Sequence, residues 1–332
     1  MKKFLTISMT MIFLMALFVA CNNDDDHDGT GLRRSNYFVT VLTGPTSGIF
    51  FPIGGAFSSH LRHIGYRTSV TATGATVENI RFILGGQGEM AIAMSDAVIQ
   101  AIQAYGAFEG QAPATELRAM MGLWPNYVQI VTVEGSGITR FEDMRGRRIG
   151  VGAPNSGVEL NARMMFEAHG MTYADANVDF LAYGQAIEQM RNGLIDAAFV
   201  TSGLGNATIR ELSATNNVAF VPVEGEGRQR LLELYPFFVE SYIPAYIYGT
   251  AADTQTVSVM NIMLVSNTLP SSVVYDILEN VYSEEGMGTI SASHSNALNH
   301  IMLSTALRGI YGTVIPFHDG AVEFFKSRGM MD

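Results

Sequence analysis

The hydrophobic and polar positions of this chain change their period repeatedly from Asn36 onward. Short runs rich in apolar and β-branched residues alternate with segments whose apolar positions recur at helical spacing. This alternation is typical of βαβ units and a parallel sheet. The pattern predicts strands at 37–42, 68–73, 90–94 and 117–123, then at 148–151, 178–182, 197–201 and 218–222, and helices near 52–64, 77–84, 97–105, 158–169, 185–192 and 206–215.

Two segments of the chain resemble each other. GATVENIR, starting at Gly74, and GQAIEQMR, starting at Gly184, share a glycine, a glutamate and an arginine at the same offsets. Each precedes a glycine, an acid and a short apolar run that ends in hydroxyl residues, although the spacing from the glutamate to the acid differs. The likeness therefore indicates either duplication or convergence. In both cases it predicts two similar α/β lobes.

A third part of the chain, from Val257, predicts a strand and then a helix at 271–282. We expect it to return to the first lobe, so that the chain crosses between the lobes twice. Right-handed crossovers place the loops at the carboxyl ends of the strands along one edge of each sheet. The prediction is a two-lobed α/β fold with a hinged cleft: lobe 1 at 36–132 plus 258–332, lobe 2 at 133–257, and crossings at 127–133 and 242–248.

The first residues resemble an export signal. Lys2 and Lys3 precede an apolar run that ends at Cys21, the only cysteine of the chain. A basic start, a short apolar stretch and a small residue before the cleavage point predict a lipoprotein signal peptide at 1–20 with lipidation at Cys21. A membrane-spanning helix is the alternative, and the run is at the short limit for one. The acidic segment within 21–35 predicts a flexible tether. We expect a protein on the outer side of the cell membrane, periplasmic or surface-exposed, and anchored to the lipid bilayer.

Composition excludes several functions. A net charge of −11 argues against nucleic acid as a partner. The chain contains no G-x-S-x-G, no H-E-x-x-H and no second cysteine, so the motifs of common hydrolases and metal sites are missing. We therefore expect no enzyme activity, no cofactor and no metal.

The loop VGAPNSGVELNAR, which begins at Val151, has the glycine spacing of a phosphate-binding loop. Val158 and Glu159 stand where such a loop needs Lys and Ser or Thr, so nucleotide hydrolysis is poorly supported. Ser156 and Glu159 instead form an S-x-x-E capping box. The helix dipole and the remaining amides of this helix start also favour a small carboxylate. Ser156 is therefore either a helix cap or a ligand contact.

The other loops at the predicted cleft contribute hydroxyls, amides and aromatic rings, which is the composition of a pocket for a small polar molecule. Asp96 is the only acid among them, and no arginine lies in these loops. Asp96 either pairs with the ammonium group of an amino acid or caps the helix that follows it. From these loops the predicted site includes Thr46, Ser47, Thr73, Ser95, Tyr127 and Thr201.

These segments together resemble the TAXI family, the solute-binding subunits of tripartite ATP-independent periplasmic (TRAP) transporters. The resemblance rests on GPTSGIFFPIGG, TATGATVENIRFILGGQGEMAIAMSD, GITRFEDMRGRRIGVGAPNSGVELNAR, DAAFVTSG and IPFHDGAVEFFKSRG. It implies a type II periplasmic-binding-protein fold that closes on a solute such as glutamate, glutamine or a related carboxylate. The matching positions are Thr46, Ser47, Gly48, Thr73, Ser95, Asp96, Asn155, Ser156, Gly157, Asn161 and Thr201. The family usually has tyrosine where this chain has Phe50 and Phe51, and we include Phe51 in the predicted site.

The sequence thus predicts a receptor that delivers a small-molecule carboxylate, either an amino acid such as glutamate or a dicarboxylate, to the membrane subunits of a TRAP permease. The alternatives are a receptor for an ABC importer and a lipoprotein that senses the solute for signalling.

Overall fold

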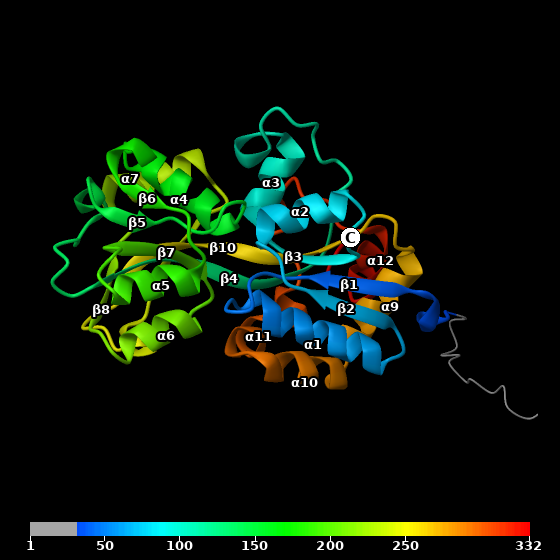
Figure 1. The fold of residues 1–332 in the computed structure, drawn as a ribbon. Coiled ribbons are helices and arrows are strands. Elements are labelled where there is room, and N and C mark those ends of the chain that lie inside the picture. The colour runs from blue at the N-terminus through cyan, green and yellow to red at the C-terminus, as the bar shows by residue number, and fades with distance from the viewer. Residues whose placement is uncertain (1–31) are drawn as a thin grey trace, which may run out of the picture.

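The computed structural model describes residues 32–332, so the predicted signal peptide, Cys21 and most of the predicted tether lie outside the described residues. Figure 1 shows two groups of elements, which we call lobe 1 and lobe 2, joined by two long strands. The blue start and the orange to red end of the chain lie together in lobe 1. Within residues 32–332, no helix is long and apolar enough to cross a bilayer.

The elements of lobe 1 come from both ends of the described chain. The strands are β1 (Phe38–Leu42), β2 (Arg67–Thr71) and β3 (Met90–Met94). The helices are α1 (Phe50–His63), α2 (Thr76–Leu84), α3 (Ser95–Gln103), α9 (Ser271–Val281), α10 (Glu284–Ser293), α11 (Ser295–His300) and α12 (Asp319–Ser327), with short 3-10 turns η1 (Arg34–Asn36), η2 (Gly106–Phe108) and η5 (Leu303–Thr305).

Lobe 2 is formed by the middle of the chain. Its strands are β5 (Arg148–Gly150), β6 (Asn177–Asp179), β7 (Ala197–Ser202), β8 (Val218–Val221) and β9 (Val239–Ile243). Its helices are α4 (Gly157–Ala168), α5 (Tyr183–Arg191), α6 (Ala207–Ser213), α7 (Gly225–Leu234) and α8 (Ala245–Tyr248), with 3-10 turns η3 (Phe141–Met144) and η4 (Tyr173–Asp175).

Two long strands, β4 (Arg118–Val133) and β10 (Thr254–Val265), belong to both lobes. They are antiparallel to each other, and through them the strands form one sheet in the order β2-β1-β3-β10-β4-β7-β5-β6, with β8 on β4 and β9 on β10. The pairs β1–β2, β1–β3, β5–β6 and β5–β7 are parallel. The prediction of a two-lobed α/β fold is confirmed.

The paths between the lobes differ from the prediction. The expected strands at 117–123 and 127–133 are one strand, β4, and the second crossing is β10 rather than 242–248. Pro125 lies inside β4 opposite Met260, where the register with β10 shifts. A proline lacks a backbone donor, so a strand accepts it at such an irregularity. The side chains of Asn126 and Asn261 bond across this point at 3.0 Å.

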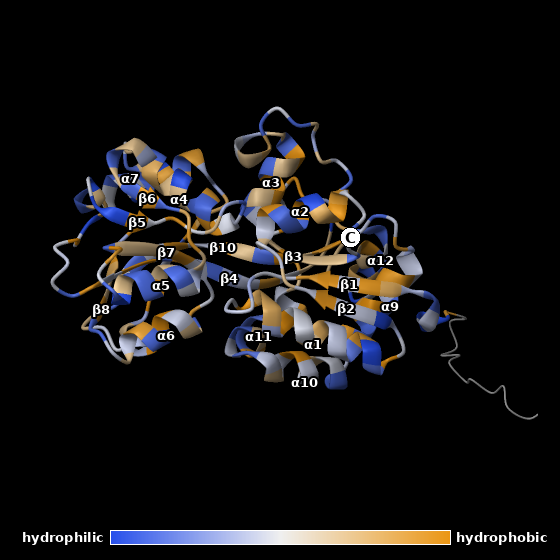
Figure 2. Cartoon of the chain, in the orientation of Figure 1, coloured by the Kyte–Doolittle hydropathy of each residue, from blue (hydrophilic) through white to orange (hydrophobic). Residues whose placement is uncertain are grey.

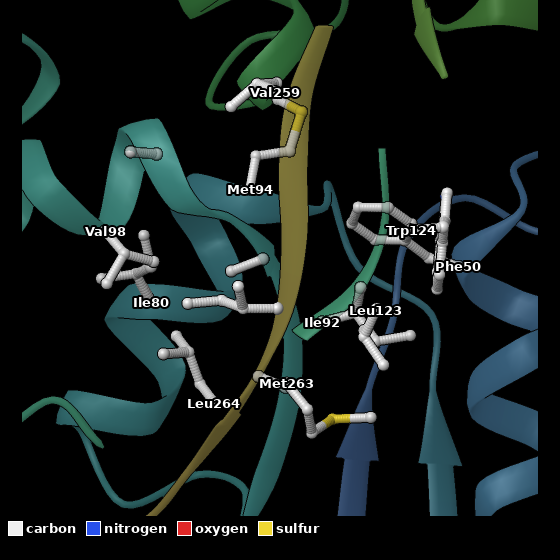
Figure 3. Packing of buried hydrophobic residues seen from close by; sticks show 14 of the residues in the cluster. Phe50, Ile80, Ile92, Met94, Val98, Leu123, Trp124, Val259, Met263 and Leu264 are labelled. Carbon is white, nitrogen blue, oxygen red and sulfur yellow. The ribbon is translucent and has the colours of Figure 1, made fainter. Parts of the chain in front are cut away.

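Helices lie on both faces of the sheet (Figure 1), and the main hydrophobic core packs between them and the strands, several of which are orange in Figure 2. All five residues of β3 are buried, which is typical of a strand covered on both faces. Trp124 packs its ring edge-on against Phe50 at 5.7 Å between centroids (Figure 3). Phe50 is the first residue of α1, so this contact fixes the start of α1 against β4.

Candidate functional site

A cavity of about 40 Å³ lies between the two lobes. Four helices begin at its wall: α1 and α2 from lobe 1, and α4 and α5 from lobe 2. The helix-start residues that line it are Ile49 and Phe50 of α1, Ala75 and Thr76 of α2, Ser156, Gly157 and Val158 of α4, and Ala182 and Tyr183 of α5. The two similar segments form the starts of α2 and α5. Gly74 and Thr76 of the first segment line the cavity, and on the α5 side the lining residues, Ala182 and Tyr183, directly precede the second segment.

None of the residues that line this cavity carries a charged side chain. The first amides of a helix have no carbonyl partner within the helix, and the helix dipole adds a partial positive charge at that end. Four such ends around an uncharged cavity favour a small anion. The hydroxyl of Thr201, at the end of β7, lines the same cavity, is 1% exposed and has no hydrogen-bond partner. A buried hydroxyl without a partner is costly, and a bound solute would supply one.

Tyr183 gives the cavity a neutral aromatic wall. Its hydroxyl donates to the carbonyl oxygen of Thr201 at 2.6 Å. Burial raises the pKa of this hydroxyl well above its usual range, so Tyr183 stays protonated. The sequence analysis missed Tyr183 and Met94, which also lines the cavity. The internal repeat could have indicated Tyr183, because it precedes Gly184 as the predicted Thr73 precedes Gly74.

Ser156 acts as a helix cap. Its hydroxyl accepts from the amide of Glu159 at 3.2 Å and donates to the carbonyl of Ala153 at 2.7 Å. The cap half of the predicted capping box is thus present, whereas the Glu159 carboxylate pairs with Arg163 at 2.6 Å. The Ser156 hydroxyl already donates its hydrogen to the Ala153 carbonyl. A solute would therefore accept hydrogen bonds from the backbone amides of Gly157 and Val158 rather than from this side chain.

Four of the predicted site residues line the cavity: Gly48, Ser156, Gly157 and Thr201. The other nine do not line it. Thr46 and Ser47 are exposed in the turn before α1, Asn155 is exposed, Phe51, Thr73 and Tyr127 are partly buried, and Ser95, Asp96 and Asn161 are buried. Thr73 instead supports α2, donating to Asn79 at 2.6 Å.

Asp96 and Asn161 contact each other across the lobe boundary. The amide nitrogen of Asn161, on α4, donates to Oδ2 of Asp96, on α3, at 2.6 Å, and both residues are 0% exposed. The remaining side-chain oxygen of each residue has no partner. Burial raises the pKa of Asp96 to about 6, although the amide of Ala97 and the side chain of Asn161 act in the opposite direction.

Gly157 lies at a tight contact between the lobes. A Cβ atom there would lie 2.0 Å from Cε of Met94 and 3.2 Å from Cβ of Thr76, both in lobe 1. Arg81 of α2 also donates to the side chain of Asn155, before α4, at 2.9 Å. We call this arrangement, with the lobes in contact, the closed form; a larger side chain at the first position of α4 would have to displace Met94 and press on Thr76.

A second space of about 380 Å³ also lies between the lobes, and charged side chains of both signs line it. They are engaged with neighbouring groups: Arg163 pairs with Glu159, and Tyr235 donates to Glu167 at 2.6 Å. Because its two positive and two negative side chains balance in number and contact neighbouring groups, we take the smaller cavity at the helix starts as the candidate site.

The strands shared between the lobes, the helices that cover the sheet and the cavity between the lobes are the features of the type II periplasmic-binding-protein fold that the sequence predicts. The chain belongs to the NMT1-like family, whose model matches residues 41–329.

Among solved structures, the chain is similar to a phosphonate-binding component of an ABC transporter from Pseudomonas aeruginosa, with 12% identity, coverage of 77% of this chain and 78% of that one, and a TM-score of 0.48. It is also similar to the alkanesulfonate-binding protein SsuA from Xanthomonas axonopodis pv. citri, with 10% identity, 89% and 94% coverage and a TM-score of 0.46. A third is the aliphatic sulphonate binding protein SsuA from Escherichia coli, with 9% identity, 77% and 78% coverage and a TM-score of 0.43.

Proposed function

We propose that this protein is an extracytoplasmic solute receptor that closes its two lobes around a small carboxylate and presents it to a membrane permease. The observation that carries the proposal is the convergence of four helix starts, two from each lobe, on one uncharged cavity. A ligand shifts an equilibrium between open and closed forms only by binding one form more tightly. A solute held by helix starts of both lobes has this preference, because its full set of contacts exists only in the closed form.

The lining narrows the class of solute. It holds no carboxylate for an ammonium group and no side-chain cation for a second acidic group. Helix dipoles stabilise one negative charge by about 0.3–1 kcal/mol each when exposed and up to about 2 kcal/mol when partly buried. A volume of 40 Å³ corresponds to roughly three water molecules. We therefore favour a compact monocarboxylate over the amino acid or dicarboxylate expected from the sequence.

The class of permease is a separate question. The resemblance to the TAXI family supports a TRAP permease. The ABC-importer alternative is at least as well supported, since the phosphonate-binding protein named above is an ABC component and none of the three similar structures is named for a TRAP transporter. Dependence of uptake on ATP hydrolysis or on an ion gradient separates the two. A sensing lipoprotein would bind the same solutes without supporting uptake.

We expect a thermal-shift screen to identify short monocarboxylates, including 2-oxo and 2-hydroxy acids of two to four carbons, as stabilising ligands. A ligand at 100 times its dissociation constant stabilises the folded form by about 2.7 kcal/mol. Matched amino acids and dicarboxylates of the same chain length serve as comparison compounds. Stabilisation by glutamate alone would contradict the ligand class, and no shift with any carboxylate would contradict the proposed function.

Thr201→Val provides the matched variant for this screen. Valine has the shape of threonine but lacks the buried hydroxyl, which has no partner within the described chain. We expect the free protein to keep or slightly increase its stability and the best ligand to bind about tenfold or more weakly, the amount that a hydrogen bond to a charged group contributes. Unchanged affinity would show that the solute does not use Thr201.

The lipid anchor stays a prediction from the sequence. We expect Cys21→Ser to release the protein from membranes into the soluble fraction, because Cys21 is the only residue that can carry the acyl chains. Fractionation followed by immunodetection measures this. Unchanged retention of the variant in the membrane fraction would indicate an uncleaved membrane-spanning helix instead.

A further inference from the structure

In the contact between Asp96 and Asn161, one buried side-chain oxygen of each residue receives no hydrogen bond. The two side chains share one hydrogen bond, from the Asn161 amide to Asp96 Oδ2, yet Oδ1 of Asp96 and Oδ1 of Asn161 are both buried without a partner. Both of these oxygens are acceptors when Asp96 is ionised. Two acceptors cannot satisfy one another, and each buried one left unpaired costs free energy.

We propose that this contact is a proton-binding site, and that Asp96 takes up one proton from solvent when the lobes close. The proton forms an O–H bond at Oδ1 of Asp96, and this hydroxyl donates to Oδ1 of Asn161. The carboxylic acid and the amide are then joined by two hydrogen bonds, one in each direction. No other bond forms or breaks, and the closed protein gains one positive charge relative to the open form.

Closure is needed for this site because its two halves belong to different lobes. Asp96 lies on α3 in lobe 1 and Asn161 on α4 in lobe 2. When the lobes separate, water reaches Asp96 and its pKa returns toward the ordinary value of about 3.9. In the closed form, burial raises the pKa of Asp96 to about 6. The closed form therefore binds more protons between about pH 4 and pH 6, so closure is favoured at low pH and weakens as the pH rises through about 6.

The charged groups around Asp96 do not supply a cation for its carboxylate. Strands β3 and β10 carry no ionisable residue, and Asp96 is the only one on α3. On α2, Glu78 accepts from the amide of Gly74 and Arg81 donates to Asn155. On α4, Glu159 and Arg163 pair with each other, and Glu167 accepts from Tyr235. Tyr105, before η2, is neutral, because burial and then the charge of Asp96 raise the pKa of its hydroxyl.

Carbon-13 NMR of protein labelled at the aspartate carboxyl carbons tests the proposal without any solute. Loss of one resonance in Asp96→Asn assigns the signal of Asp96. We expect this signal in the wild-type protein to titrate near pH 6. In Gly157→Leu, whose side chain would hold the lobes apart at Met94 and Thr76, we expect it to titrate about two pH units lower. These values correspond to a closure constant about tenfold larger at pH 5 than at pH 7.

Small-angle scattering first establishes that the solute-free wild type is closed. Two results would then overturn the proposal: titration near pH 4 in the closed wild type, or titration near pH 6 in both proteins, since the second would place the raised pKa within lobe 1 alone. Met94→Trp places a larger side chain at the same contact from the lobe 1 side, so it also holds the lobes apart. It replaces Gly157→Leu if that variant does not fold. Small-angle scattering verifies that the variant is open. Because no solute is present, failure here leaves the proposed receptor function standing, and failure of the carboxylate screen leaves this titration unaffected.

Discussion

Gly157→Leu is expected to weaken solute binding by roughly 100-fold or more while the protein stays folded. A new Cβ at this position would lie 2.0 Å from Cε of Met94 and 3.2 Å from Cβ of Thr76. The Met94 methyl can move, but Thr76 is a short side chain next to the start of α2, and the rest of a leucine side chain needs more room than the contact leaves. The two lobes must separate, which removes half of the helix starts from the solute. Two helix starts that each stabilise the negative charge by about 1–2 kcal/mol when partly buried account for a loss of about two orders of magnitude in affinity.

Gly184→Leu is the matched control for this variant. Gly184 is the second residue of α5, also in lobe 2, and an added Cβ there meets nothing within 4 Å. Both changes replace glycine by leucine in the first turn of a helix, so they alter helix propensity similarly. Isothermal titration with the best ligand of the screen and small-angle scattering measure affinity and opening. Equal affinity in the two variants would show that contact at Gly157 is not needed for binding.

Asp276→Ala is expected to destabilise lobe 1 by about 3–5 kcal/mol. Asp276, on α9, accepts from Arg34 at 2.9 and 2.7 Å and from the Tyr66 hydroxyl at 2.7 Å. The side chains of Arg34 and Asp276 are 20% and 7% exposed, respectively. Removing one partner of a buried ion pair leaves the other charge without compensation, which costs this amount. Urea unfolding followed by circular dichroism measures the loss.

Glu279→Ala is the control on the same helix. Glu279 pairs with Arg328 at 3.3 Å, but about half of each side chain is exposed. Exposed pairs contribute about 0–1 kcal/mol, so this variant should unfold close to the wild-type urea concentration. If the two variants lost the same stability, Asp276 would have no special role in joining α9 to the start of the described chain.

Local patterns were enough to predict the elements that form the site. The glycine and hydroxyl residues before Gly157 predicted a helix start, and Ser156 caps it as expected. The repeated segment predicted two similar lobes, and the two helices that contain it, α2 and α5, begin at one cavity. Such predictions succeed because caps and periodic apolar positions depend on residues three or four apart. The lobe boundaries and the ligand contacts stay predictions.

The sequence by itself determined a two-lobed α/β chain with helix starts at the strand ends, because hydrophobic period and turn chemistry act over a few residues. Only the tertiary structure decided that β4 runs unbroken through Pro125, that Tyr183 and Met94 reach the cavity, and that Asp96 contacts Asn161 rather than the cavity. Asp96 and Asn161 are 65 positions apart. Their contact depends on how closely the two lobes pack at Gly157. Patterns of residues three or four positions apart cannot predict this packing between lobes.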